Sequence, residues 1–347
     1  MPQPAWRWPA EWEPQAAILI AWPHAGTDWA ERLAQVTDTY VALSAAITRF
    51  QPLRICVPDA AVRASAREAL GDLAGHPNLR FVEVPYHDTW LRDSGPITLV
   101  GGAGRFRLGD FRFTGWGGKF AAETDDALVA ALFARQLFAA GAQRQRIDWP
   151  LEGGAVESDG HGGILTTWRC LHQRHPQQDH AALAHKLCRE LAGERVLWLE
   201  HGALQGDDTD AHIDTLARFA PDDGIVYQAC DDPADPHFAD LGAMATELAA
   251  LRTDGGAPYR LHPLPWPRPI LDKGRRLAAS YANYLIVNGA VLIPAYGDAA
   301  DEAAAAVIAA AHPGREIVPV PCRPLIWQNG SLHCLTMQLP AGSLAAG

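Results

Sequence analysis

Two patterns of apolar residues alternate along the chain. Short runs rich in β-branched and aromatic residues are typical of strands, and longer segments with an apolar residue every three or four positions are typical of helices. The predicted strands are Ala17–Trp22, Leu53–Pro58, Leu79–Pro85, Pro96–Val100, Arg105–Phe113, Gly163–Thr167, Val196–Glu200, Gly224–Ala229, Tyr284–Ile293 and Glu316–Val320. The predicted helices are Glu31–Phe50, Ala60–Leu73, Asp125–Ala140, Asp179–Ala192, Phe238–Leu251 and Glu302–Ala311. Because the two kinds of element are interleaved, the sequence predicts an α/β fold.

The ends of the elements and of the chain carry further signals. Asp125 and Asp301 stand at the start of predicted helices, where an aspartate side chain can cap the first backbone amides. No Ser/Gly-rich linker and no low-complexity tract interrupts the pattern, so we expect one domain over residues 1–347. Residues 341–347 are mostly small and end the chain, and we expect them to form a disordered tail.

Composition and charge exclude several classes of protein. The chain lacks the run of about 18 apolar residues that a membrane span needs. Its first residues lack the basic-then-apolar layout of a signal peptide, which predicts a cytoplasmic location. The formal net charge is −11 and no Lys/Arg cluster stands out, which argues against a nucleic-acid binder. Acidity suits a small cationic substrate but also simply aids solubility. A homo-oligomer is compatible with the sequence, which does not fix the number of subunits.

The six cysteines give one candidate for chemistry. None of them forms a Cys-x-x-Cys pair, so a zinc ribbon or a dithiol redox motif is not expected. Most are predicted to be small buried side chains. An unpaired cysteine close to a histidine and to acids would instead be a candidate nucleophile.

Acids, histidine, tryptophan and glycine concentrate in four segments between or beside the predicted strands. These segments are His87–Pro96, Leu151–Gly160, Gly206–Asp214 and Asn329–Met337. In the first, Asp93 precedes a Ser-Gly-Pro turn, and its carboxylate could serve only to bind nearby backbone amides. In the second, Glu152 precedes two glycines, which would let a ligand approach the backbone closely but are also common in a hairpin loop.

The third and fourth segments favour a site more strongly. His212 and Asp214 are two residues apart, so they share one face if the segment is extended. Their cluster of ionisable groups favours a site, with a metal as a competing interpretation because His-x-Asp can ligate one. A calcium loop is not expected because the regular spacing and closing Glu are absent. Cys334 follows a Gly-Ser turn, and beside the other three segments it becomes a candidate nucleophile.

Together the four segments supply a thiol, an imidazole and several carboxylates. Carboxylates match the planar N–H donors of a guanidinium group, and a thiolate can attack its central carbon. A positively charged substrate would favour the thiolate, and a histidine could protonate the departing ammonia and then activate water. This chemistry requires neither a metal nor an organic cofactor, and the partner it implies is a small cationic guanidinium substrate.

Eight motifs in order resemble those of the agmatine deiminase family, which includes bacterial peptidylarginine deiminase-like proteins, within the pentein superfamily. The motifs are Glu11–Pro14, Ala21–His24, Thr89–Pro96, Gly115–Lys119, Leu151–Gly154, Asp208–Asp214, Ser280–Tyr284 and His333–Thr336. The resemblance implies five ββαβ units in a closed, five-bladed α/β propeller with the site in a central channel. It also implies hydrolysis of agmatine to N-carbamoylputrescine and ammonia, a step of polyamine synthesis.

The same resemblance implies roles for individual residues. Cys334 would be the nucleophile and His212 the general acid and base. Asp93 and Asp214 would bind the guanidinium group, and Glu152 would support that group or His212. The remaining residues that it implies for substrate binding are Trp90, Trp116 and Asp208, the last toward the distal amine of agmatine.

Departures from the family pattern leave other activities open. The nucleophile loop contains Gln328-Asn329-Gly330 in place of a run of glycines, Ala211 stands where glycine is common, and Gln173–Pro176 replaces Asn-Arg-Asn-Pro. Free or peptidyl arginine is an alternative substrate, for which Arg92 or Arg323 could face the carboxylate of free arginine. The superfamily also contains amidinotransferases and a non-catalytic ribosome-binding factor, and a metal-dependent hydrolase is a further alternative.

Overall fold

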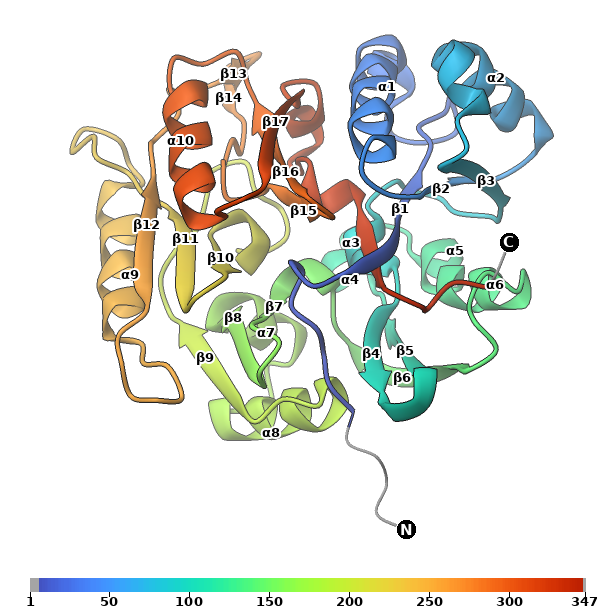
Figure 1. The fold of residues 1–347 in the computed structure, drawn as a ribbon. Coiled ribbons are helices and arrows are strands. Elements are labelled where there is room, and N and C mark those ends of the chain that lie inside the picture. Colours follow the sequence, from blue (N-terminus) through green and yellow to red (C-terminus); the bar gives the residue numbers. More distant parts are fainter. Residues whose placement is uncertain (1–5, 346–347) are drawn as a thin grey trace.

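The computed structural model describes residues 6–345, which form several small mixed sheets with helices between their strands (Figure 1). The first sheet contains β18 (Met337–Pro340), β1 (Gln15–Ala21), β2 (Leu53–Val57) and β3 (Leu79–Glu83). The second contains β4 (Ile97–Gly101), β5 (Arg105–Arg112) and β6 (Ala142–Pro150), and the third β7 (Val156–Ser158), β8 (Gly163–Thr167) and β9 (Arg195–Leu199). The fourth contains β10 (Ala217–Ala220), β11 (Gly224–Gln228) and β12 (Arg260–Leu264), and the fifth β15 (Leu285–Val287), β16 (Ala290–Ala295) and β17 (Glu316–Pro321).

These five sheets share one pattern of strand pairing. In each, the first strand pairs antiparallel with the second, and the second pairs parallel with the third. A parallel pair needs a crossover, and helices fill it in every case. The crossover helices are α1 (Leu33–Thr48), α5 (Glu123–Asp126) with α6 (Leu128–Ala134), α7 (Trp168–Arg174) with α8 (His180–Leu191), α9 (Phe238–Ala250) and α10 (Asp301–Ala311). The remaining α-helices and strands are α2 (Ala60–Leu70), which connects the parallel strands β2 and β3, α3 (Leu91–Ser94), α4 (Gly115–Gly118), which precedes α5 in the crossover from β5 to β6, β13 (Leu271–Asp272) and β14 (Arg275–Arg276).

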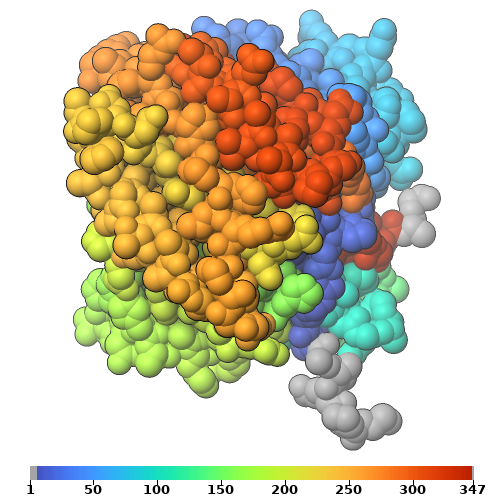
Figure 2. Space-filling model, turned by 60° about the vertical axis from the view of Figure 1, so that its left-hand side comes forward, coloured from blue at the N-terminus to red at the C-terminus, as the bar shows by residue number. Residues whose placement is uncertain are grey.

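The two ends of the chain meet in the first sheet, where β18 pairs with β1. The N-terminal segment also contacts the fifth sheet, because the Gln15 side chain donates to the carbonyl oxygen of Ile286 at 3.0 Å. In Figure 2 the blue N-terminal segment accordingly lies beside the orange and red part of the chain. Within residues 6–345, no helix is long and apolar enough to cross a membrane.

The predicted α/β alternation is confirmed, and β8 has the predicted bounds. The predicted strand Tyr284–Ile293 is instead a hairpin of β15 and β16, with the turn made possible by a positive φ of 77° at Gly289. Strands β6, β7, β10, β12 and β18 and helix α7 were not predicted. Strand β6 shows why, because its sequence AQRQRIDWP is largely polar and several of its side chains are exposed.

Both predicted helix caps are wrong. Asp301 lies inside α10, where its carboxylate accepts hydrogen bonds from the Tyr281 hydroxyl and from the amides of Tyr296, Gly297 and Asp298. Asp125 lies inside α5 and accepts from the amides of His87 and Asp88. Asp125 thus ties a distant loop to its helix, whereas Asp301 binds mainly the loop that directly precedes α10.

The prediction of a disordered tail is also wrong for residues 341–345, while residues 346–347 lie outside the described residues. The carbonyl oxygen of Ser343 accepts from the Ala139 amide at 2.8 Å, and the Ala345 amide donates to Leu137 at 3.0 Å. Leu344 forms a bridge with Phe138 beside α6. These backbone hydrogen bonds to another part of the chain hold a segment whose own composition has little tendency to order.

Candidate active site

A cavity of about 200 Å³ contains five of the side chains singled out from the sequence, namely Trp90, Asp93, Trp116, Asp208 and Cys334. Its other lining residues are Asp28, Asp88, Phe120, Thr209, Arg275, Trp327, Gln328, Asn329 and Gly330. The remaining predicted residues lie behind these side chains: His212 contacts Asp93, Asp214 contacts Cys334, and Glu152 contacts His212. The structure therefore brings all eight predicted residues to one place.

The five sheets position this group in the same way. Each site segment immediately precedes the first strand of a sheet: Asp93 in α3 before β4, Gly154 before β7, and Asp214 before β10. Asn283 precedes β15 and Cys334 precedes β18. Residues that are distant in sequence thus converge at equivalent ends of five strands, where polar groups are commonly gathered for function.

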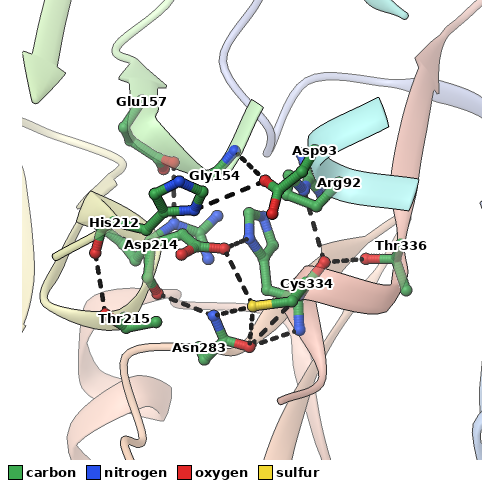
Figure 3. Close-up of polar contacts among 12 residues, drawn as sticks. Arg92, Asp93, Gly154, Glu157, His212, Asp214, Thr215, Asn283, Cys334 and Thr336 are labelled. Carbon is green, nitrogen blue, oxygen red and sulfur yellow. Dashed lines mark hydrogen bonds and ion pairs between the residues drawn. The ribbon is translucent and has the colours of Figure 1, made fainter. Parts of the chain in front are cut away.

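The thiol of Cys334 is buried among polar groups (Figure 3). Its Sγ lies 3.6 Å from Asp214 Oδ2, and the Asn283 side chain contacts it at 3.2 Å through Nδ2 and at 3.4 Å through Oδ1. Burial raises the pKa of Cys334, and the negative charges of Asp214 and Asp93 raise it further, well above its usual range. A bound cation would oppose this shift by offsetting the two negative charges.

His212 lies between two carboxylates. Its Nδ1 is 3.6 Å from Asp93 Oδ1 and its Nε2 is 3.6 Å from Glu152 Oε2. Neither ring nitrogen has a hydrogen-bond partner among the described residues, although the side chain is only 1% exposed. Burial lowers the pKa of His212, but the charge of Asp93, with Cys170 and Glu152, raises it well above the usual value. The ring is thus buried between two acids, at distances slightly longer than hydrogen bonds.

Asp93 lines the cavity and Asp214 contacts the nucleophile, and their pKa values shift in opposite directions. Asp93 accepts from Trp116 Nε1 at 2.8 Å and from the Gly154 amide at 2.9 Å. Burial raises the pKa of Asp93, in part against the lowering effect of His212. Burial alone would raise the pKa of Asp214, but the hydrogen bond from His333, together with the positive charges of His333, His212 and Arg218, lowers it. Asp214 Oδ1 has no partner among the described residues, so it can receive a donor from a ligand.

Gly154 keeps the centre of the site open. A Cβ atom at this position would lie 2.7 Å from His212 Nδ1, 2.8 Å from Asp93 Oδ1 and 3.2 Å from Asp214 Oδ2. Contacts this short would force the neighbouring side chains to move. The glycine is therefore needed for the close approach of three side chains, whereas the sequence had suggested the close approach of a ligand.

Basic residues from outside the four segments neutralise some of the acids. Arg174 Nε lies 2.8 Å from Glu152 Oε1, and its NH1 lies 2.7 Å from Asp210 Oδ2, which also pairs with Lys119 at 2.7 Å. The carboxylate of Asp207 is used by its own loop. Among the acids of Gly206–Asp210, Asp208 is the one that lines the cavity, where its Oδ2 accepts from Asn329 Nδ2 at 2.7 Å.

One group of ligand atoms could hold a metal ion. Glu152, Cys170 and His212 each offer an atom, and these atoms lie within 4.8 Å of one another. The donor set suits zinc. However, the ion pair of Arg174 with Glu152 and the raised pKa of His212 place positive charge where a cation would bind. Burial raises the pKa of Cys170, which also opposes formation of a thiolate ligand.

Several residues of the site were missed from the sequence. Glu11, Arg174, Asn283 and His333 all lie in or beside segments quoted for the resemblance, but no role was given to them. Their importance depends on partners more than 20 positions away, such as the 2.7 Å contact between Glu11 and His333. Arg275 of β14 was also missed, because nothing in its local sequence marks it as part of a cavity.

Comparison with known proteins adds a family to this geometry. Residues 7–340 match the family model of the Porphyromonas-type peptidyl-arginine deiminase. The chain belongs to this family. The match includes the segments that carry Asp93, Glu152, His212, Asp214 and Cys334.

Similar proteins are named either agmatine deiminase or arginine deiminase. The agmatine deiminase of Stutzerimonas stutzeri is 32% identical over 359 residues, covering 96% of this chain and 95% of that protein. A crystal structure of a candidate arginine deiminase from Porphyromonas gingivalis is 44% identical, with a TM-score of 0.91 over 98% of this chain and 99% of that one. A substrate-bound cysteine-to-serine variant of the C. jejuni agmatine deiminase is 33% identical, with a TM-score of 0.88 over 96% of each chain.

Proposed function

We propose that this protein is a cysteine-dependent guanidine deiminase, and that it hydrolyses agmatine to N-carbamoylputrescine and ammonia. One observation carries the proposal: the Cys334 thiol lies 3.6 Å from Asp214, whose second carboxylate oxygen is buried without a partner beside a cavity that Asp93 also lines. A planar cation with several N–H donors satisfies both carboxylates at once. The agmatine deiminases among its relatives support the choice of substrate.

The first half of the reaction forms a covalent intermediate. The guanidinium cation, bound by Asp93 and Asp214, offsets the two charges that raise the pKa of Cys334, and the thiol loses its proton to solvent. The thiolate then attacks the central carbon, forming a C–S bond. The His212 imidazolium gives its proton to one amino group, the C–N bond breaks and ammonia leaves. The products of this half are a thiouronium cation on Cys334 and a neutral His212.

The second half returns the enzyme to its starting state. Neutral His212 takes a proton from water, and the hydroxide adds to the same carbon. The C–S bond then breaks, so that Cys334 leaves as a thiolate, and the proton that the forming ureido product gives up returns to this thiolate. Glu152 supports His212 through the contact at 3.6 Å, and Arg174 holds Glu152 in place. Trp90 and Trp116 line the cavity beside the substrate, and Asp208 faces the distal amine of agmatine.

The fold proposed for this activity is a single domain that closes into a five-bladed propeller. The common strand pattern of the five sheets supports it, as does the pairing of β18 with β1. Site residues placed before the first strand of each sheet would then face a shared central channel. In the cytoplasm, hydrolysis of agmatine would serve putrescine synthesis.

The test is ammonia release from purified protein supplied in parallel with agmatine, free arginine and a peptide ending in arginine. We expect release from agmatine, with Cys334→Ala inactive but still able to bind agmatine in calorimetry. Formation of an amidino-transfer product with an added amine, in place of the ureido product, would instead support an amidinotransferase. Release that persists in Cys334→Ala would refute the proposed nucleophile.

A second candidate substrate is free arginine, and one side chain favours it. Arg275 lines the cavity, where it donates to Trp327 and to Asn329 Oδ1, while the same Asn329 side chain binds Asp208. Arg275 and Asp208 thus place a cation and an acid in the same cavity, where they would pair with the carboxylate and the ammonium group of an amino acid. Arg92 is buried against Gln338, and neither it nor the exposed Arg323 lines this cavity. If arginine is the substrate, Arg275→Gln raises the KM for arginine and leaves that for agmatine unchanged.

A further inference from the structure

A second buried histidine stands directly before the nucleophile. His333 is 1% exposed, and both of its ring nitrogens lie close to carboxylates. Its Nδ1 is 2.8 Å from Asp214 Oδ2, and its Nε2 is 2.7 Å from Glu11 Oε2. Carboxylate oxygens accept hydrogen bonds, so a ring nitrogen that carries a proton can donate it to the acid beside it. His333 therefore links the guanidinium-binding acid to the N-terminal segment.

Glu11 is itself held firmly. Arg218 NH2 donates to Glu11 Oε2 at 2.7 Å, and the Ile286 amide donates to Glu11 Oε1 at 2.7 Å. Arg218 is fixed in turn by Glu157 at 2.9 Å and by the carbonyl oxygen of Tyr284 at 2.7 Å. Glu11, Arg218 and Glu157 are all buried. Such a network gives Glu11 a single position, so it can act as a rigid anchor for the imidazole ring.

Asp214 depends on this anchor for its orientation. Among the described residues, the His333 ring is the one nitrogen donor to the Asp214 carboxylate, and the remaining contact of that group is the Cys334 thiol. Both contacts are made by Oδ2, so Oδ1 stays free on the other side of the group. A carboxylate without the Nδ1 contact could rotate and present neither oxygen correctly.

We propose that Glu11 and His333 form a positioning pair, in which the anchored ring holds Asp214 Oδ2 beside Cys334 and directs Asp214 Oδ1 toward the substrate. This inference rests on the proposed deiminase function and adds two residues to it. Neither residue touches the substrate. Both act through Asp214, so their removal should impair binding and attack together, whereas loss of the acid–base His212 should impair chemistry alone.

Two matched substitutions test the proposal. In His333→Asn the side-chain amide replaces the Nδ1 donor and keeps the contact with Asp214, whereas in His333→Gln it replaces the Nε2 donor and keeps the contact with Glu11. Both variants lose the same imidazole ring from the same buried place. We expect kcat/KM for the active substrate to fall about 100-fold in His333→Gln, the size of effect that a misplacement of about 1 Å produces. His333→Asn keeps the contact with Asp214 but loses the anchor, so it should lose less activity than His333→Gln. The fall in His333→Gln should be shared between a higher KM and a lower kcat.

Controls separate positioning from damage to the fold. His237→Gln changes another buried histidine that pairs with a carboxylate, Asp235, at 2.6 Å outside the site, and its kcat/KM should match that of the wild type. In an Asp214→Asn background, the difference between His333→Asn and His333→Gln should disappear, because the group they position is gone. Equal kcat/KM in the two folded His333 variants would overturn the proposal.

Two further measurements keep the test decisive. If either His333 variant fails to fold, Glu11→Gln replaces it, since it removes the anchor's charge but leaves the ring, and an unchanged kcat/KM there would overturn the proposal. If the wild type releases no ammonia, the proposed function fails by itself. Positioning is then measured as agmatine and arginine binding to Cys334→Ala by calorimetry, with and without His333→Gln, and an unchanged affinity for a bound ligand would reject it.

Discussion

Two buried histidines, His212 and His333, each lie between two carboxylates, but the spacing around them differs. Both contacts of His212 are 3.6 Å long, and both of its nitrogens lack a hydrogen-bond partner among the described residues. The contacts of His333 are 2.8 Å and 2.7 Å long. Because the desolvation of an unpaired buried polar group costs about 1–3 kcal/mol, the open arrangement of His212 is not explained by stability.

The difference indicates two kinds of task. A ring held by two short, charge-assisted hydrogen bonds has its protons and its orientation fixed, which suits a residue that positions others. A charged ring with loose partners can pass a proton to a leaving group and accept one from water with little reorganisation. The substitutions below test whether this contrast in geometry corresponds to a contrast in function.

The largest expected effect is the loss of proton transfer in His212→Gln. General acid–base catalysis contributes roughly 10²–10⁴-fold, so kcat should fall by about 10³-fold or more while substrate binding changes much less. His333→Gln should instead lower kcat/KM by about 100-fold with a clear change in KM. Steady-state ammonia release gives both values. A kcat for His212→Gln within tenfold of wild type would remove His212 from the acid–base role.

A second prediction concerns the pH dependence of the thiol. Burial and the charges of Asp214 and Asp93 raise the pKa of Cys334, so the free enzyme should react slowly with iodoacetamide at neutral pH and faster as pH rises. Asp93→Asn removes one negative charge, which lowers the thiol pKa and moves the midpoint of the alkylation profile to lower pH. Mass spectrometry of the Cys334 peptide measures the rate.

The matched control for that profile is Asp148→Asn, which removes an acid whose side chain is 80% exposed and pairs with Arg112. Its midpoint should equal that of the wild type. A midpoint in Asp93→Asn that stays unchanged or moves to higher pH would mean that Asp93 does not control the charge state of the nucleophile.

The sequence predicted the chemical groups of the site better than their partners. Cys334, His212, Asp93, Asp214 and Glu152 lie in segments dense in ionisable residues, and the structure brings these segments together. The pairing of His333 with Glu11 joins positions 322 residues apart, and no local spacing encodes it. Motif resemblance located both residues, but only the fold shows what they contact.

Helices and strands were likewise predicted best where the local sequence pattern is strong. Strong helical periodicity placed α8, α9 and α10 to within one or two residues, because one face of each helix is buried. Helix α6 ends at Ala134, short of the predicted Ala140, since Gln136 takes a positive φ of 56° and the chain turns toward β6. Strand β10 was missed because its four residues ARFA are too few to give a pattern, although its side chains are all buried.

The smallest expected effect concerns the backbone that leads to the open histidine. Ala211, directly before His212, has a φ of 70°, and Asp210 has a φ of 67°. A non-glycine residue in this left-handed region costs roughly 1 kcal/mol, and glycine is free of that cost. Ala211→Gly should therefore stabilise the protein by up to about 1 kcal/mol, measured as a higher midpoint of chemical unfolding, with kcat changed by less than a factor of about two.

An alanine-to-glycine substitution within a helix is the control for the direction of this shift in unfolding midpoint. Ala45 lies exposed within α1, where glycine is less favourable than alanine by about 1 kcal/mol, so Ala45→Gly should lower the unfolding midpoint. Opposite shifts in the two variants would show that the segment of the open histidine carries backbone strain. Leu332, before the closed histidine His333, has an ordinary φ of −59°. If Ala211→Gly destabilises the protein as Ala45→Gly does, the two histidines differ in their side-chain contacts but not in the strain of the backbone that presents them.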